Sequence, residues 1–129
     1  MKITLIDHIV LTVADIERTV EFYRRGLGME KEVFDNGRVA LRFGDQKINL
    51  HQVGREFEPK AGNPTPGSAD LCFITPAGLE QAMAEVRTLG IPIEEGPVDR
   101  IGARGRMRSF YFRDPDGNLI EVASYRGGA

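Results

Sequence analysis

The chain has 129 residues, of which 41% are hydrophobic and 28% charged, and this suits one globular domain with its own core. Its formal net charge of −2 gives no support for binding to nucleic acids or to anionic membrane surfaces. No apolar run of about 18 residues occurs, and the N-terminus lacks a signal-peptide pattern. The single cysteine, Cys72, excludes an intrachain disulfide, so we expect a cytoplasmic protein without a membrane partner.

The first half of the chain opens with a predicted strand over residues 3–13, which is rich in β-branched side chains. Asp15 stands at the N-cap position of a following helix, and Gly26 is expected to end that helix. Its apolar face is formed by Ile16, Val20, Tyr23 and Leu27. Turn residues, Asp35-Asn36-Gly37 among them, then separate three further predicted strands, at 31–34, 38–43 and 47–53.

The second half begins with a predicted strand over residues 69–75. Thr75 is expected to cap the next helix, because Pro76 follows it and suits the first helical position. Gly90 is expected to end this helix, whose apolar face is formed by Leu79, Met83 and Val86. The remaining predicted strands cover 91–98, 106–113 and 118–125, with a tight turn at 114–117.

The two halves therefore share one element order, strand–helix–strand–strand–strand. Two copies of about 60 residues are too few for a solenoid and suit a pseudo-symmetric domain. We predict the α+β class, with two βαβββ repeats that form curved mixed sheets within a single domain. The expected organisation is repeat one at 3–53, a glycine- and proline-rich linker at 54–67, and repeat two at 68–126.

Side chains alternate along a strand, so each strand presents one face to the helices and the other to the hollow of its sheet. Polar groups of four strands fall on the hollow side, namely His8, His51 together with Asn49, Asp70 and Glu121. A carboxylate is costly to bury there unless it is paired or metal-bound. Imidazole and carboxylate groups form a normal ligand set for Mn²⁺, Fe²⁺, Ni²⁺ or Zn²⁺.

Three motifs carry a resemblance to a known superfamily: Asp7-His8-Ile9, then Glu21-Phe22-Tyr23 with Leu27-Gly28, and the segment 112–121 with its Asp-Pro-Asp-Gly-Asn turn. In this combination the chain resembles the vicinal oxygen chelate proteins. These include glyoxalase I, the fosfomycin- and bleomycin-resistance proteins and the extradiol dioxygenases. Segments 47–52, 57–60 and 66–70 resemble a subgroup of small glyoxalase-domain-containing proteins, some labelled virulence-related. The resemblance implies a glyoxalase-like fold and a homodimer.

The resemblance also implies where a metal would bind, because the superfamily uses the first and last strands of each unit. By position these residues are His8, Asn49, Asp70 and Glu121. Asp70 departs from the histidine of glyoxalase I, and Asn49 departs from a glutamate. Since imidazole binds transition metals better than an amide does, we predict His51 in place of Asn49. The predicted metal set is therefore His8, His51, Asp70 and Glu121, with Glu121 and His51 as the catalytic residues.

Substrate-binding residues are predicted in the seventh strand and the loop before it, where arginines crowd a glycine-containing stretch. Arginine suits the carboxylate or phosphate of a substrate. Within the resemblance, Ser109 and Tyr111 match serine and tyrosine positions of the fosfomycin enzymes. The predicted substrate-binding residues are Arg106, Arg108, Ser109, Tyr111 and Arg113.

These residues favour a metal-dependent lyase, isomerase or transferase that acts on a small oxygen-rich metabolite or antibiotic. The metal would act as a Lewis acid on vicinal oxygens. One alternative is a non-catalytic protein that sequesters a drug or metabolite, as bleomycin-resistance proteins do. Another is an Fe²⁺ extradiol dioxygenase, in which His8, His51 and Glu121 would form a two-histidine, one-carboxylate triad.

Overall fold

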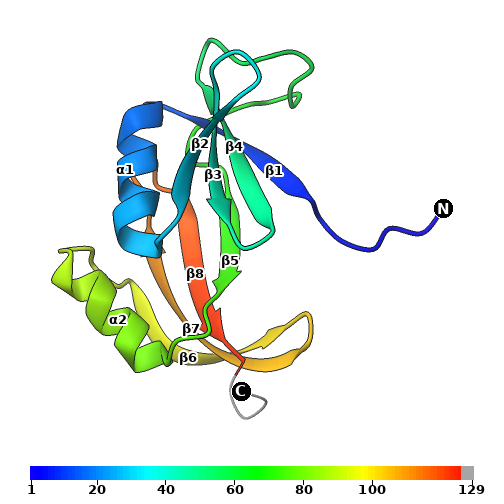
Figure 1. The fold of residues 1–129 in the computed structure, drawn as a ribbon. Coiled ribbons are helices and arrows are strands. Elements are labelled where there is room, and N and C mark those ends of the chain that lie inside the picture. The colour runs from blue at the N-terminus through cyan, green and yellow to red at the C-terminus, as the bar shows by residue number, and fades with distance from the viewer. Residues whose placement is uncertain (126–129) are drawn as a thin grey trace. The chain divides into compact units, whose positions relative to one another are not determined.

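The computed structural model describes residues 1–125. The chain divides into two compact units, which meet in sequence between Gly67 and Ser68. Each unit consists of four strands and one helix in the order βαβββ (Figure 1). The predicted α+β class and its internal repeat are confirmed. Neither helix of the described residues is long and apolar enough to cross a membrane.

The first unit forms a four-stranded mixed sheet in the order β1-β4-β3-β2. Its strands pair in parallel between β1 and β4 and antiparallel elsewhere. The strand order places β1 and β2 at the two edges of the sheet. The elements are β1 (His8–Val13), α1 (Ile16–Leu27), β2 (Glu30–Phe34), β3 (Arg38–Phe43) and β4 (Gln46–Gln52). Asp35 and Asn36 have positive φ values of 47° and 65° at the hairpin between β2 and β3, as expected for this turn.

The second unit repeats this plan with the order β5-β8-β7-β6. Again the first and last strands, β5 and β8, pair in parallel and the others antiparallel. The elements are β5 (Asp70–Ile74), α2 (Leu79–Thr88), β6 (Glu95–Gly102), β7 (Gly105–Arg113) and β8 (Leu119–Ser124). A bulge interrupts the pairing of β6 with β7 between Glu95 and Val98.

Each unit has its own core between its sheet and its helix. In the first unit, buried side chains of the sheet and of α1 form it: Leu11, Val13, Leu41, Ile48, Leu50, Val20 and Tyr23. The corresponding set in the second unit is Phe110, Phe112, Ile120, Val122, Leu79, Met83 and Val86. Full burial of one such side chain stabilises the fold by about 1.5–3 kcal/mol. The opposite face of each sheet is thus left for polar groups.

Helix α1 begins as predicted but ends later. Asp15 is the N-cap, because its carboxylate accepts a hydrogen bond of 3.0 Å from the backbone N–H of Arg18. Gly26 does not end the helix. Gly28 does, since it adopts the left-handed conformation (φ 67°) and its N–H donates to the carbonyl of Tyr23.

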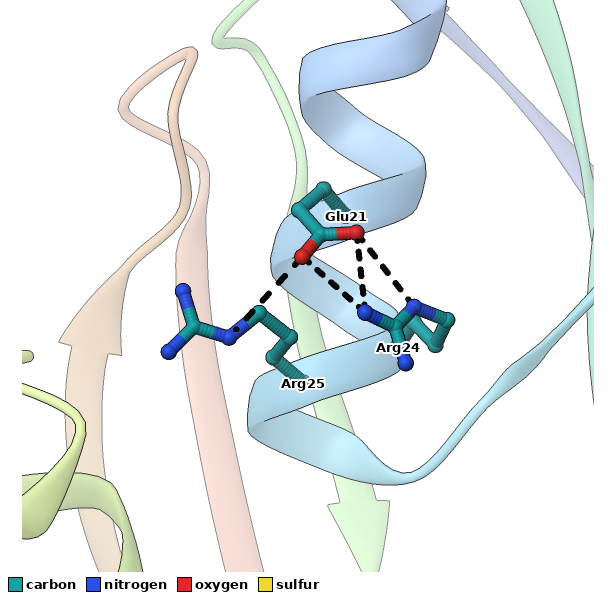
Figure 2. Close-up of polar contacts among 3 residues, drawn as sticks. All are labelled: Glu21, Arg24 and Arg25. Atoms are coloured by element: carbon teal, nitrogen blue, oxygen red, sulfur yellow. Dashed lines mark hydrogen bonds and ion pairs between the residues drawn. The ribbon is translucent and has the colours of Figure 1, made fainter.

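The Glu-Phe-Tyr motif of α1 divides between surface and core. Tyr23 is fully buried, whereas Glu21 lies on the solvent side and forms ion pairs with Arg24 at 3.0 Å and Arg25 at 3.9 Å (Figure 2). Such exposed pairs along one helix stabilise it only slightly. This motif therefore serves the fold, and we assign it no part in a site.

Three further predicted boundaries are wrong. The strand β1 starts at His8, and the preceding Ile3 and Leu5 are 76% and 71% exposed. Helix α2 starts at Leu79 with Gly78 as N-cap. Thr75 instead accepts a hydrogen bond of 3.1 Å from the N–H of Ala77, closing a short turn. Strand β6 covers 95–102 in place of the predicted 91–98.

Candidate functional site

Titratable side chains form one row across the sheet of the second unit, on the face away from α2. The strand register pairs Cys72 of β5 with Glu121 of β8, Glu121 with Tyr111 of β7, and Tyr111 with Glu95 of β6. Register partners of a sheet point to the same face, at about 4.8 Å between strands. The row Cys72–Glu121–Tyr111–Glu95 is called the acidic row below. It brings four ionisable groups within reach of their neighbours.

Glu121, in the middle of the acidic row, has a carboxylate that is only half satisfied. Its Oε2 atom is buried and has no hydrogen-bond partner within residues 1–125. A buried carboxylate oxygen without a donor is unfavourable unless a proton, a cation or a ligand satisfies it. Glu121 therefore has the properties of a ligand or a base.

Two neighbours of Glu121 respond to its charge. Desolvation, together with the carboxylate of Glu121, raises the pKa of the Cys72 thiol to about 11. Burial, with a further contribution from Glu121, raises the pKa of Tyr111 above its ordinary value, although Arg100 opposes this. Both groups are therefore protonated at neutral pH, and each can donate a hydrogen bond toward the carboxylate. The Cys72 thiol is a poor nucleophile in this state.

Asp70 lies on the same face as Glu121. It pairs with Leu119, two residues before Glu121, which places the two carboxylate-bearing residues about 7 Å apart along the strands. The neighbouring N–H of Ala69 donates to the side chain of Asn118 at 2.8 Å, which attaches β5 to β8 at this end. The carboxylate of Asp114 in turn accepts three hydrogen bonds of 2.8 to 2.9 Å from Asp116 and Asn118. The Asp-Pro-Asp-Gly-Asn turn thus sets the register of Asp70 and Glu121.

The first unit has an equivalent row with different chemistry. Its members, in the same strand positions, are Val10, Asn49, Ala40 and Glu32. Asn49 occupies the place of Glu121, and its Oδ1 atom is likewise buried without a partner within residues 1–125. His8 pairs with Lys47, two residues before Asn49, just as Asp70 does relative to Glu121. By register, His8 and Asn49 are thus the counterparts of Asp70 and Glu121.

His8 is exposed and is held by the residue before it. Its Nδ1 atom lies 2.8 Å from Oδ2 of Asp7, and this contact lowers the pKa of the Asp7 carboxyl. A carboxylate on one ring nitrogen orients the imidazole and fixes which nitrogen remains available. This role of Asp7 was not predicted from the sequence, although its place directly before His8 was the signal.

His51 lies in a different environment, with only 8% of its surface exposed. The rings of His51 and Phe57 pack edge to face, with their centroids 5.7 Å apart. The guanidinium carbon of Arg38 lies over the Phe57 ring, 4.3 Å from its centroid. Desolvation first, and Arg38 second, lower the pKa of His51 below its ordinary value. Phe57 belongs to the predicted linker and was not expected to contact a candidate site residue.

The register also separates the two histidines. His51 pairs with Thr12, four residues beyond His8, so their backbones lie about 13 Å apart along the parallel strands. Within the described part of the chain, no three His, Cys, Asp or Glu side chains lie close enough together to hold a metal ion. The predicted metal ligands come from both units, and this set stays a prediction.

The predicted substrate-binding residues fall on two faces of β7. Ser109, Tyr111 and Arg113 share the face of the acidic row, and the Oγ of Ser109 is buried without a partner within residues 1–125. Arg106 and Arg108 alternate with them. Arg108 donates at 2.8 Å to Glu80 of α2, and it therefore faces the helix. Arg113 binds Glu94 through two nitrogens, at 2.9 and 3.1 Å. The structure thus brings three of the five together.

Comparison with known proteins agrees with this geometry. Residues 5–122 match the family described as the Glyoxalase/Bleomycin resistance protein/Dioxygenase superfamily. The chain belongs to this superfamily. It is 57% identical to virulence protein STM3117 of Salmonella typhimurium, over 97% of this chain and 87% of that protein.

Solved structures of other proteins show the same fold. The integron cassette protein VCH_CASS1, from the mobile metagenome of V. Cholerae, is 62% identical with a TM-score of 0.96, covering 97% of this chain and 98% of that one. Lactoylglutathione lyase from Agrobacterium tumefaciens is 26% identical with a TM-score of 0.73, covering 96% of each chain. The resemblance stated from the motifs is therefore confirmed at the level of the superfamily.

Proposed function

We propose that this glyoxalase-superfamily protein is a divalent-metal-dependent enzyme that acts on a small, oxygen-rich substrate. The observation that carries the proposal is the buried, unpartnered Oε2 of Glu121 at the centre of the acidic row. A protein gains nothing in stability from such an atom, whereas a ligand or base must keep an oxygen available. The similarity to a lactoylglutathione lyase supports an enzymatic function.

The residues fit a divalent metal in their chemistry. Glu121 offers a free oxygen, Asp70 offers a second carboxylate on the same face, and His8 is the imidazole ligand that the resemblance implies. Carboxylate oxygens and one imidazole suit Mn²⁺, Fe²⁺, Ni²⁺ or Zn²⁺. When bound, such an ion supplies Lewis-acid polarisation of substrate oxygens. Asp7 would orient His8 through its 2.8 Å contact.

Other side chains of the protein would bind the substrate and move its proton. Burial and Arg38 lower the pKa of His51, so its imidazole is neutral near pH 7 and can accept a proton. The buried hydroxyl of Ser109 can donate to a substrate oxygen. Arg113 can bind a carboxylate or phosphate, in exchange for part of its contact with Glu94. Glu121 is the second candidate for proton transfer.

We also keep the homodimer as part of this proposal. β1 and β5 are edge strands of their sheets, and edge strands leave backbone groups that another chain can cover. A second copy would bring further donors to the metal. Light scattering that gives the mass of a monomer, about 14 kDa, at micromolar concentration would contradict the dimer.

Sequestration of a drug or metabolite without catalysis is the second candidate. The superfamily includes bleomycin-resistance proteins, and no three metal-binding side chains cluster within residues 1–125. The extradiol dioxygenase has less support, because the register holds His8 and His51 about 13 Å apart along their strands. A two-histidine triad needs both imidazoles on one ion.

Isothermal titration calorimetry of chelator-treated protein with Mn²⁺, Ni²⁺, Zn²⁺ and, under anaerobic conditions, Fe²⁺ tests the proposal. We expect at least one ion per chain with a Kd below about 1 mM for one or more of these metals. An exposed carboxylate variant, Glu85→Gln on α2, serves as control and should bind as the parent does. Absence of binding for all four metals would overturn the metal-dependent enzyme and favour sequestration.

A further inference from the structure

A chain of polar contacts leads to Glu121 from the opposite edge of its sheet. Arg100 of β6 donates from Nε to the hydroxyl of Tyr111 at 2.8 Å. The same guanidinium contacts Glu95 at 3.3 Å through Nη2 and the carbonyl of Asp99 at 3.0 Å through Nη1. Arg100 therefore has three partners that fix its orientation, and it is a fixed donor to Tyr111.

The hydroxyl of Tyr111 has a single proton, and its direction is determined by its neighbours. Arg100 occupies a lone pair of the oxygen, so the O–H must point elsewhere. The cross-strand partner of Tyr111 on the other side is Glu121, and the carboxylate of Glu121 is near enough to the phenol to affect its pKa. The contacts thus run Glu95–Arg100–Tyr111–Glu121.

We infer that Tyr111 is a positioning residue, whose hydroxyl, oriented by Arg100, holds one oxygen of the Glu121 carboxylate and leaves Oε2 available for a cation or a substrate proton. This inference rests on the proposed function of Glu121. Tyr111 was predicted from the sequence to bind substrate. In the inferred arrangement its proton is directed to Glu121 and one lone pair accepts from Arg100. Little of that hydroxyl's capacity remains for a substrate.

The equivalent row of the first unit lacks the tyrosine and its arginine partner. Ala40 stands where the second unit has Tyr111, so Asn49 has no hydroxyl beside it. Glu32 stands where the second unit has Glu95, and it binds Arg42 directly at 2.9 Å. The second unit therefore has a tyrosine–arginine pair beside Glu121, and the first unit has none at the same position beside Asn49. This difference is expected if the pair holds the Glu121 carboxylate.

Tyr125 provides a matched control within the same unit. Its hydroxyl accepts a hydrogen bond of 3.0 Å from the N–H of Arg104, and the Arg104 guanidinium lies over its ring at 4.3 Å. It is thus a second tyrosine with an arginine partner. Tyr125 lies four residues beyond Glu121 in the chain and is not a member of the acidic row, so Tyr125→Phe removes a similar hydrogen bond outside that row.

The experiment compares Tyr111→Phe, Tyr125→Phe and the parent protein by calorimetry with Mn²⁺ and by crystal structures without metal. We expect Tyr111→Phe to bind Mn²⁺ about 10-fold more weakly, the scale for loss of a group that orients a ligand. In its crystal structure, Glu121 should occupy more than one conformer. Tyr125→Phe should match the parent in both measurements.

A Tyr111→Phe protein with parent affinity and one ordered Glu121 conformer would overturn the inference. If the parent binds no Mn²⁺, the proposed function fails, while the Glu121 conformers still decide whether Tyr111 positions that carboxylate. If Tyr111→Phe does not fold, Arg100→Gln tests the same set of contacts from a half-buried position and should likewise disorder Glu121. An ordered Glu121 in that variant would count against the inference.

Discussion

The two units of this protein have the same strands in the same register, yet the middle rows of their sheets differ in charge. The second unit places Glu121 and Tyr111 where the first has Asn49 and Ala40. Backbone geometry alone therefore does not decide what a position does. The duplicated fold supplies equivalent positions, and the side chains at one of the two make it a candidate for chemistry.

The polar faces of the two units also differ in their cations. In the first unit, Lys47 lies over the ring of Phe34 at 3.7 Å and Arg38 over that of Phe57 at 4.3 Å. In the second unit, Arg100 and Arg113 each pair with a glutamate. Each unit also has a cation of the other kind, because Arg42 of the first unit pairs with Glu32 and Arg104 of the second lies over the ring of Tyr125. The two units therefore differ in which positions carry paired cations, and neither face is the more basic on these contacts.

The largest expected effect of a single change follows from the row comparison. Glu121→Gln keeps the shape of the side chain and removes its charge, so it should weaken binding of Mn²⁺ by about 100-fold. Asn49→Ala, at the equivalent position, should weaken it clearly less. Calorimetry measures both affinities, and thermal unfolding confirms that each variant folds. Equal losses in the two variants would contradict the difference between the units.

A smaller effect is expected at His51, which the register places away from His8. His51→Ala should lower metal affinity or turnover by about 10-fold if His51 is a ligand or moves a proton. Kinetics and calorimetry together separate the two parts, since a proton-transfer role lowers turnover with little change in affinity. Parent behaviour in His51→Ala, together with a loss in Asn49→Ala, would show that the repeat position is the functional one.

The smallest effect concerns the environment of His51. Phe57→Ala should raise the pKa of His51 toward its ordinary value, because the ring that desolvates the imidazole is gone. NMR titration of the two histidines measures this change. Phe34→Ala removes another aromatic ring from the same sheet, one that stacks on Lys47, and should leave His51 nearly unchanged. An unchanged His51 pKa in Phe57→Ala would place the cause of the lowered pKa elsewhere.

His51 also makes the stability of the fold depend on pH. The folded-state pKa of His51 lies below its ordinary value of 6.5, so the unfolded chain binds a proton more readily than the folded one. The contribution of His51 to stability is thus complete above about pH 6.5 and is lost as the pH falls through the folded-state pKa. Phe57→Ala should reduce this dependence, which chemical denaturation at several pH values measures.

Much of the fold could be predicted because local patterns determine it. Apolar periodicity located α1, and Asp15 marked its first turn. The tight turn after β7 was likewise evident from its residues. Thr75 and Pro76 misled the prediction for α2, because a threonine can close a short turn as well as cap a helix.

The candidate site was harder to predict, since it depends on how strands align. Alternation indicates which residues share a face, but the register between β1 and β4 is set by pairing across the sheet and decides that His51 lies away from His8. The contact of Arg100 with Tyr111 depends in addition on a bulge in β6, which no periodicity in the sequence marks.

That bulge has a consequence for how the protein tolerates genetic change. At Gly96, φ is 127° and a Cβ would lie 2.6 Å from that of Phe110, so even alanine does not fit without displacing β7. Beyond it, loss of one codon between Glu95 and Val98 would shift the rest of β6 by one residue and exchange its two faces. Arg100 would then turn from Tyr111 toward the helix side. Insertions and deletions at this hairpin should therefore be far more harmful than most replacements on the surface of the same strand.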